Sequence, residues 1–206
     1  MDGCENSGEV CGTECVGGLV GLAGDSGYFS CVRNSVNRGE VNGTSCTGGL
    51  VGLLQNCEVQ NSYNRGEVTG TDKVGGLVGQ NGYSTDYIGN VYNAYNAAPV
   101  TGSTNYSAKI GYTVSGSGSE TCYYDSDVYG DNAEDGDFTT EEMKSRASGV
   151  PYTLLDNYIA AHPYEADGWA LWNIGGVTND GYPYLTSEKA KYTPDYGTDL
   201  VLPERG

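Results

Sequence analysis

The stretch Gly17-Gly18-Leu19-Val20-Gly21 decides how this chain folds, because the same five residues return at 48–52 and again at 75–79. A second block, Asn-Arg-Gly-Glu-Val, occupies 37–41 and 64–68, and a degraded copy occupies 96–100. The copies are spaced 31, 27 and about 32 residues apart. A fixed period of this length indicates one structural unit stacked on the next.

The repeat unit favours strands over helices. It lacks the i, i+3, i+4, i+7 apolar pattern of an amphipathic helix, and each glycine would cost a helix about 1 kcal/mol relative to alanine. Short β-type stretches between Gly, Asn and Ser are what the unit contains. We therefore expect an all-β fold: a parallel β-helix-like solenoid of about four 27–32-residue coils with a small α/irregular C-terminal cap.

Stacking the copies predicts which side chains form rows along the solenoid. Val32, Val59 and Val91 align, and so do Val41, Val68 and Val100, which predicts two buried valine rows. Two asparagine rows also result, one at 34, 61 and 93 and one at 37, 64 and 96. Stacked asparagines can join their amides along the axis. We favour that structural role over the alternative of a sugar-binding row. The arginines and glutamates of the second block are expected on a charged outer face.

The chain divides into three parts. Residues 1–112 carry the repeats, with the first coil truncated; 113–185 form a terminal coil and capping region with short helices; 186–206 form a linker or tail. Thr139 followed by Glu142 predicts a helix start with a capping box. The large aromatic residues near the end, Trp169 and Trp172 among them, are expected to plug the last coil. An aromatic platform for a sugar is the alternative.

These motifs resemble the GLUG repeat, in which Gly-Leu-x-Gly is followed by Asn-x-Gly-x-Val-x-Gly. The resemblance covers roughly residues 4–112, and Cys122–Asp127 and Asn179–Leu185 are similar to the usual end of such arrays. It implies a region of a large secreted or wall-attached bacterial protein, of the kind found in adhesin-like surface proteins and in immunoglobulin A-cleaving metallopeptidases. It implies no catalytic site.

Charge restricts the partners. Ten Lys and Arg against 27 Asp and Glu leave a net charge of −17. Binding to nucleic acid or to an anionic membrane surface needs clustered basic residues, so we expect no nucleic-acid partner. No apolar run approaches the roughly 18 residues of a membrane span, so we expect no membrane insertion. The chain opens in the middle of a repeat, and we therefore expect neighbouring domains of the same parent chain as partners.

An acidic segment offers the one candidate metal site. Nine acids and no bases lie between Glu120 and Glu142. Positions 1, 5 and 12 of an EF-hand-like loop are acidic, but position 3 is alanine, which removes one ligand. The candidate calcium ligands are Asp131, Asp135, Asp137 and Glu142. A solvated acidic loop without metal is the alternative, and we expect no other cofactor.

Seven cysteines make an odd number, and none forms a C-x-x-C pair. Cys15 and Cys46 hold equivalent positions in adjacent coils, close enough for a disulfide, and Cys31 and Cys57 are nearly equivalent. A catalytic cysteine would need a basic neighbour, and His162 is the sole histidine. We expect bridged and buried thiols rather than a nucleophile.

Function follows from the regular repeat. We expect a non-catalytic extracellular module that serves as a stalk or adhesin segment at a bacterial cell surface. The alternative is a module that binds a glycan or a host protein through aromatic residues of the variable loops, namely Tyr28, Phe29, Tyr83 and Tyr87. A polysaccharide-cleaving β-helix is a third reading, for which the repeats offer only Glu40 and Glu67 as stacked acids.

Overall fold

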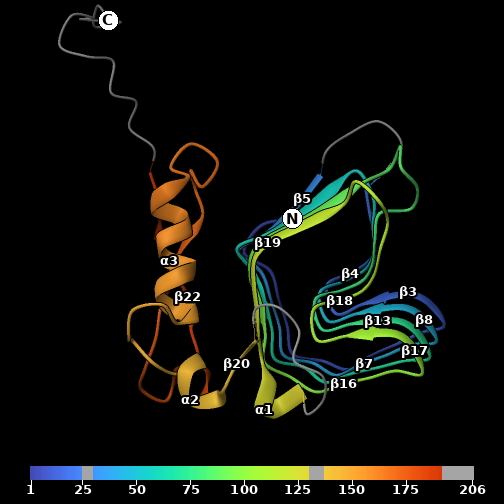
Figure 1. Ribbon diagram of the computed structural model, residues 1–206, viewed down its shortest axis with the longest axis horizontal. Helices are drawn as coiled ribbons and strands as arrows, with labels where there is room; N and C mark the ends of the chain where they lie inside the picture. The colour runs from blue at the N-terminus through green and yellow to red at the C-terminus, as the bar shows by residue number, and fades with distance from the viewer. Residues whose placement is uncertain (25–29, 130–136, 192–206) are drawn as a thin grey trace, which may run out of the picture.

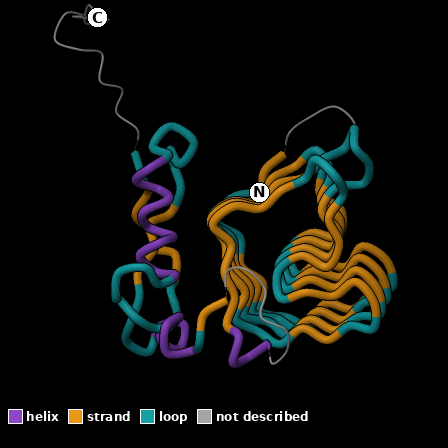
Figure 2. Tube along the Cα trace, in the orientation of Figure 1, coloured by secondary structure: helices purple, strands orange, loops and turns teal. Residues whose placement is uncertain are grey.

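The computed structural model describes residues 1–24, 30–129 and 137–191 and has two parts (Figure 1). One part is a solenoid of about four stacked coils of parallel strands (Figure 2), which confirms the predicted fold class. The other part is a layer of helices and a two-stranded sheet beside the solenoid. Every pairing between coils is parallel, so residues one repeat apart lie one above the other.

Four sheets run along the solenoid, and three of them take one strand from each coil. Sheet B consists of β2 (Val10–Cys11), β7 (Val41–Asn42), β12 (Val68–Thr69) and β16 (Val100–Thr101). Sheet C consists of β3 (Glu14–Gly17), β8 (Ser45–Gly48), β13 (Asp72–Gly75) and β17 (Thr104–Ser107). Sheet D consists of β4 (Val20–Ala23), β9 (Val51–Leu54), β14 (Val78–Asn81) and β18 (Ile110–Thr113).

The fourth sheet, here called the long sheet, has eight strands. It consists of β1 (Glu5–Asn6), β5 (Ser30–Arg33), β6 (Val36–Asn37), β10 (Cys57–Gln60), β11 (Tyr63–Asn64), β15 (Gly89–Asn96), β19 (Gly118–Asp125) and β20 (Asp137–Phe138). Strands β15 and β19 run the whole width of the sheet, whereas the earlier coils cross it as two short strands each.

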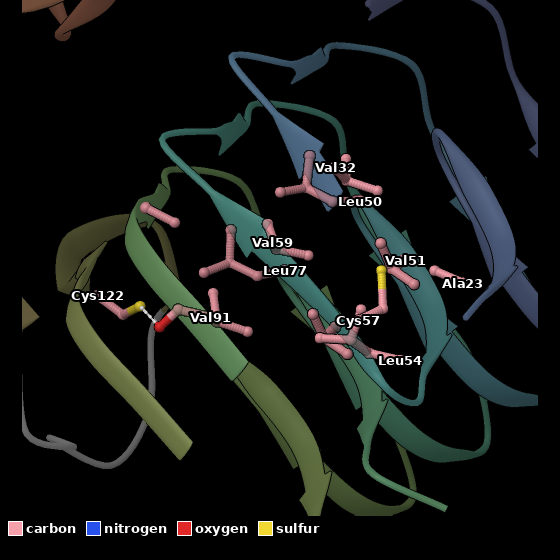
Figure 3. Close-up of a cluster of buried hydrophobic side chains, with 12 residues drawn as sticks. Ala23, Val32, Leu50, Val51, Leu54, Cys57, Val59, Leu77, Val91 and Cys122 are labelled. Carbon is pink, nitrogen blue, oxygen red and sulfur yellow. Dashed lines mark hydrogen bonds between the residues drawn. The ribbon is translucent and has the colours of Figure 1, made fainter. Parts of the chain in front are cut away.

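Both predicted valine rows are confirmed by the strand register. Val59 pairs with Val32 on one side and with Val91 on the other, and all three are buried. Val68 likewise lies between Val41 and Val100. The first row joins the leucines of the Gly-Gly-Leu-Val-Gly copies in a core between the long sheet and sheet D (Figure 3). The second row forms a smaller core with the valines of sheet C.

Glycines of the repeat allow sheets C and D to touch backbone to backbone. A Cβ placed on Gly52 would lie 2.5 Å from the carbonyl carbon of Cys15 and 2.6 Å from the amide nitrogen of Val16. A Cβ on Gly49 would lie 2.4 Å from the Asn64 side chain. No residue with a side chain fits at such distances, because non-bonded carbon contacts are optimal near 3.5–4.0 Å. The motif that repeats in the sequence is therefore a packing requirement.

The asparagine row at 37, 64 and 96, here called the inner row, forms the predicted amide ladder. The Nδ2 group of Asn37 donates to Asn64 Oδ1 at 2.8 Å, and that of Asn64 donates to Asn96 Oδ1 at 2.9 Å. Asn6 adds a fourth member through a 2.8 Å bond to Asn37 Oδ1. Each amide of the three full copies also donates to the carbonyl two residues ahead, which closes the adjoining turn. Asn37, Asn64 and Asn96 are fully buried, and the ladder satisfies them inside the solenoid.

The chain after β19 builds the second part, here called the lateral layer, which spans residues 139–190. Its elements are α2 (Thr140–Met143), α3 (Pro151–Ala161), β21 (Ala170–Asn173), the 3₁₀ turn η1 (Thr178–Gly181) and β22 (Tyr184–Lys189). A further short helix, α1 (Ser126–Tyr129), links β19 to the segment that precedes β20. The capping box predicted at Thr139 and Glu142 is present at the start of α2.

The predicted position of this layer is wrong. The sequence predicts a plug over the last coil, but the layer lies against the outer side of the long sheet (Figure 1) and packs on residues of β6, β11, β15 and β19. Trp172 packs on Tyr63 and Tyr95, with ring centroids 5.9 and 5.8 Å apart, and these tyrosines belong to successive coils. The reason is a second apolar surface: a row of outward-facing residues on β6, β11 and β15 needs cover. None of the helices in the described ranges has the length and apolar character of a membrane span.

Candidate functional site

The asparagine row at 34, 61 and 93, here called the outer row, positions the lateral layer. Asn34, Asn61 and Asn93 all adopt positive φ, between 48° and 53°, at the same bend of three successive coils. Asparagine tolerates this left-handed conformation better than most residues. The row is hydrogen-bonded along the axis, and it also pairs with strand β21: Asn34 Oδ1 accepts from the Ala170 amide at 2.6 Å, and Asn61 Nδ2 donates to the Ala170 carbonyl at 2.8 Å.

The arginines of the repeats hold the other end of the layer. Arg38 donates to Asn179 Oδ1 at 2.5 Å and to the Tyr63 hydroxyl at 2.8 Å. Arg65 lies 3.8 Å over the Tyr182 ring and pairs with Asp180 at 3.1 Å. The sequence predicts a charged outer face here, and the structure shows instead that both arginines are contacts between the solenoid and the layer.

A pocket of about 270 Å³ opens where the layer meets the long sheet. Its floor comes from β10, β15 and β19, and its wall comes from the end of α3 and the segment that follows. The strand register brings the floor residues together, since Gln60 pairs with Tyr92 and Tyr92 pairs with Glu120. The lining residues are Glu58, Gln60, Tyr92, Glu120, Tyr158, His162, Glu165 and Trp169.

The pocket is electronegative. Three carboxylates line it, and no lysine or arginine does so in the described part of the chain. Burial, and after it the charges of Glu58 and Glu120, raise the pKa of Tyr92. Burial is also the main reason why the pKa of Tyr158 is raised, followed by Glu120, Tyr92 and Glu165. A ligand that donates hydrogen bonds or carries positive charge fits such an environment.

The loop aromatics predicted as a binding surface are only partly described. Tyr28 and Phe29 lie outside the described residues. Tyr83 is 64% exposed, and Tyr87 is half-buried in the same turn. The backbone amide of Tyr83 donates to the carbonyl oxygen of Tyr87 at 2.9 Å. Neither Tyr83 nor Tyr87 lines the pocket, so these two residues lie outside the concave site.

The candidate calcium ligands are also only partly described by the structure. Asp131 and Asp135 lie outside the described residues, while Asp137 begins β20 and is exposed. Glu142 accepts from the Thr139 amide and hydroxyl, both at 2.9 Å, and these bonds lower the pKa of its carboxyl. Its carboxylate therefore already serves the helix start. Calcium binding stays a prediction, which a melting curve with millimolar Ca²⁺ and one with chelator will test.

Cys15 and Cys46 are neighbours, as their repeat positions predict. Their flanking residues pair across β3 and β8, and both cysteines have φ of 50°. Burial, and after it the Cys46 thiol, raise the pKa of Cys15. Both thiols are free in the structure, so their disulfide stays a prediction. Cys31 and Cys57 are offset by one residue in the strand register, which pairs Cys31 with Glu58 and Cys57 with Ser30, and a disulfide between them stays a prediction.

Sequence reasoning missed the pocket residues. The sequence predicts a place for Trp169 in a terminal plug, and Glu58, Tyr92 and Tyr158 belong to no motif. Alignment of the repeats places Gln60 beside Tyr92, but nothing in the sequence shows that α3 packs over this row. The pocket forms only when the lateral layer docks.

Comparison with known protein families identifies part of the repeat region. Residues 43–69 match the family model described as the GLUG motif, and these residues run from the turn before β8 to the end of β12. Together with the two flanking copies of the same blocks, the match identifies a GLUG-repeat region. Neither the curated proteins nor the solved structures searched contain a match to this chain.

Proposed function

We propose that this chain, which contains a GLUG-repeat region, is a non-catalytic spacer segment of a larger bacterial surface protein and holds neighbouring domains of that protein outside the cell. The observation that supports it most is the in-register stack. Valines, asparagines and glycines recur in successive coils, and their contacts with the equivalent residues of neighbouring coils make the solenoid stiff along its axis.

The lateral layer supports a mechanical role. Each coil of a solenoid contacts only the coils directly above and below it, so the coils can separate one at a time. Here Ala170 binds asparagines of two coils, and residues 179–182 bind Arg38, Arg65 and Asp125 from three levels of the stack. The layer therefore ties the coils together from the side and opposes their separation under load.

Two measurements test the spacer. Antibodies raised against the solenoid should label intact cells of the source organism, and treatment of those cells with protease should remove the label; labelling that requires lysis contradicts the extracellular placement. Single molecules pulled from their ends should lose the lateral layer and the coils in one event. Stepwise loss of single coils at low force contradicts the mechanical role.

A second candidate function is binding of a glycan or host protein. The exposed Tyr83 and the pocket beside α3 support it independently of each other. A screen of the purified chain against glycans and host proteins, repeated with Tyr83→Ala, tests the loop. A saturable hit that this substitution abolishes makes the chain a binding module rather than a spacer alone.

A further inference from the structure

We propose that the chain joins Lys73 to Gln80 by an amide bond between their side chains, with the Cys46 thiol as the nucleophile that prepares this bond. The cross-link connects β13 of sheet C to β14 of sheet D. It is a reaction of the chain with itself and takes place once in each molecule. It goes beyond the spacer role and does not rest on it, because the surface-labelling and pulling experiments have separate outcomes.

Gln80 breaks the repeat at a position where the other coils have leucine or tyrosine. The register of sheet D pairs Gln80 with Leu53 on one side and with Tyr112 on the other, and Leu53 pairs with Leu22. Gln80 is only 6% exposed, so a polar side chain occupies a buried place in this row. Burial of an amide costs free energy unless the amide is hydrogen-bonded, so Gln80 needs specific partners.

The partners come from a row on sheet C, which lies beside sheet D (Figure 1). Cys15, Cys46 and Lys73 hold equivalent positions in successive coils, and their φ angles lie between 50° and 54°. Cys46 Sγ donates to Gln80 Oε1 at 3.3 Å, and Lys73 Nζ donates to the same oxygen at 2.8 Å. Gln80 Nε2 donates to the Gly82 carbonyl at 2.8 Å. One carboxamide is therefore held between a thiol and an ammonium group.

These groups are the ones that acyl transfer from a carboxamide requires. When Cys46 Sγ adds to the Gln80 carbonyl carbon, negative charge develops on Oε1, and the Lys73 ammonium group stabilises it there. The C–N bond then breaks, and the amide nitrogen leaves as ammonia with the proton of the thiol. A thioester now joins Cys46 to Gln80.

Lys73 completes the reaction as the second nucleophile. It gives one proton to the released ammonia, and its neutral Nζ attacks the thioester carbon. The C–S bond breaks, a proton of Nζ passes to the sulfur, and the Cys46 thiol is regenerated. An ammonium side chain and a carboxamide thus become an amide and an ammonium ion, and no oxidant takes part. The contact of Nζ with the acyl group makes this step intramolecular, which favours it over attack by water.

The second cysteine of the row sets a condition on the reaction. A disulfide between Cys15 and Cys46 would remove the nucleophile, so the cross-link forms only in the reduced chain. The sequence predicts thiols without a nucleophilic role, because its sole histidine is far from six of the seven cysteines along the chain. The structure provides a lysine from the next coil and a carboxamide from the facing sheet, and no motif announces either.

Peptide mapping of the reduced whole chain tests the proposal after incubation at about pH 9, at which most free thiols and a small share of amines are deprotonated. Trypsin cleaves after Lys73 in the unreacted chain and yields peptides 66–73 and 74–109. The cross-link blocks this cleavage, so one peptide of residues 66–109 should appear, lighter by one ammonia. Complete cleavage after Lys73 with no loss of ammonia overturns the proposal.

Matched serine variants test the nucleophile. Cys46→Ser should slow the cross-linking about tenfold or more, whereas Cys15→Ser, the same change at the equivalent position of the neighbouring coil, should leave the rate within about twofold. Equal rates in the two variants overturn the role of Cys46. Gln80→Leu introduces the residue of the preceding coil, and it should prevent the cross-link while the chain still folds.

Methylamine added to the parent chain tests the thioester, because it competes with Lys73 for the acyl group. It should become attached to Gln80 and not to Gln55 or Gln60, the other glutamines of the chain, and Cys46→Ser should abolish the attachment. Equal labelling of all three glutamines, labelling of Gln80 that persists in Cys46→Ser, or cross-linking without any label overturns the thioester step.

Discussion

Asn61 Nδ2 donates to the carbonyl oxygen of Ala170 at 2.8 Å, although the two residues are 109 positions apart. The same amide group also donates to Asn34 Oδ1 at 2.8 Å. One side chain therefore bonds both to the neighbouring coil and to the layer that covers the coils. The backbone bend at positive φ directs these asparagines outward, so a local conformation decides where a distant segment docks.

Asn61→Asp should loosen the lateral layer. The substitution keeps the shape and the tolerance for positive φ but replaces the donor with a carboxylate that faces two acceptor oxygens. Backbone amides of residues 169–190 should exchange hydrogen at least about tenfold faster, while those of sheets B and C stay protected. Asn157→Asp, exposed on α3, is the control and should leave both regions unchanged. Uniform acceleration in both regions after Asn61→Asp contradicts a selective docking role.

Gly52→Ala should destabilise the solenoid by at least about 3 kcal/mol, or prevent folding, because the added methyl group would lie 2.5 Å from the backbone of the adjacent sheet. Gly8→Ala is the matched control. Its Cβ would come no closer than 3.7 Å to another atom, and its cost should stay within about 0.5 kcal/mol. Urea unfolding followed by circular dichroism measures both. Equal stability of the two variants would show that the sheets can move apart to admit a side chain.

Asn64→Ala should cost about 2–4 kcal/mol, because the Asn64 side chain makes four buried hydrogen bonds, each with a net value of about 1 kcal/mol. The change also leaves the amides of the two neighbouring asparagines with one partner fewer. Asn42→Ala, at a half-exposed position with one bond to Glu9, should cost about 0.5 kcal/mol or less. A loss for Asn64→Ala no larger than that of the control means that the ladder contributes nothing to stability.

Stability should fall above pH 9, in part through Cys122. Burial raises the pKa of this thiol from 9.0 to about 12. Between those values the unfolded chain loses the proton while the folded chain keeps it, so the free energy of unfolding drops by up to about 1.4 kcal/mol per pH unit. Cys122→Ala should fold well, because Ala94 occupies the paired position in the preceding coil. Denaturant unfolding curves recorded between pH 8 and 10.5 under reducing conditions give the free energy of unfolding at each pH. This free energy should decrease less steeply with pH in the variant than in the parent chain, and an identical pH dependence contradicts the assignment.

Oxidation should join Cys15 to Cys46. Their strands are paired in register, and adjacent strands lie about 4.8 Å apart, within the range that a disulfide spans. Incubation with oxidised glutathione should transfer two electrons from the thiol pair and release two molecules of reduced glutathione. Mass spectrometry should then find a Cys15–Cys46 peptide, and the unfolding free energy should rise by about 3 kcal/mol. Cys15→Ser should abolish both effects. A mixed disulfide with glutathione at Cys46 in the intact pair would contradict the prediction.

The sequence by itself determined the solenoid. The fixed period predicted the stack, the aligned copies predicted the valine rows and the amide ladder, and Thr139 with Glu142 predicted the start of α2. These features are local or are repeated between neighbouring coils, and each copy confirms the others. Contacts between repeats can be predicted from the sequence because the partner of a residue is the equivalent residue one repeat away.

The tertiary structure alone decided the position of residues 139–190 and the pocket that they enclose. This segment has no repeat to give its register, and its aromatic residues could cover either the end or the side of the stack. The side was selected because Tyr63 and Tyr95 offer an apolar surface there and Asn34 and Asn61 offer hydrogen bonds to a strand backbone. Complementarity of two separate surfaces depends on both folded shapes, and no pattern within either segment contains it.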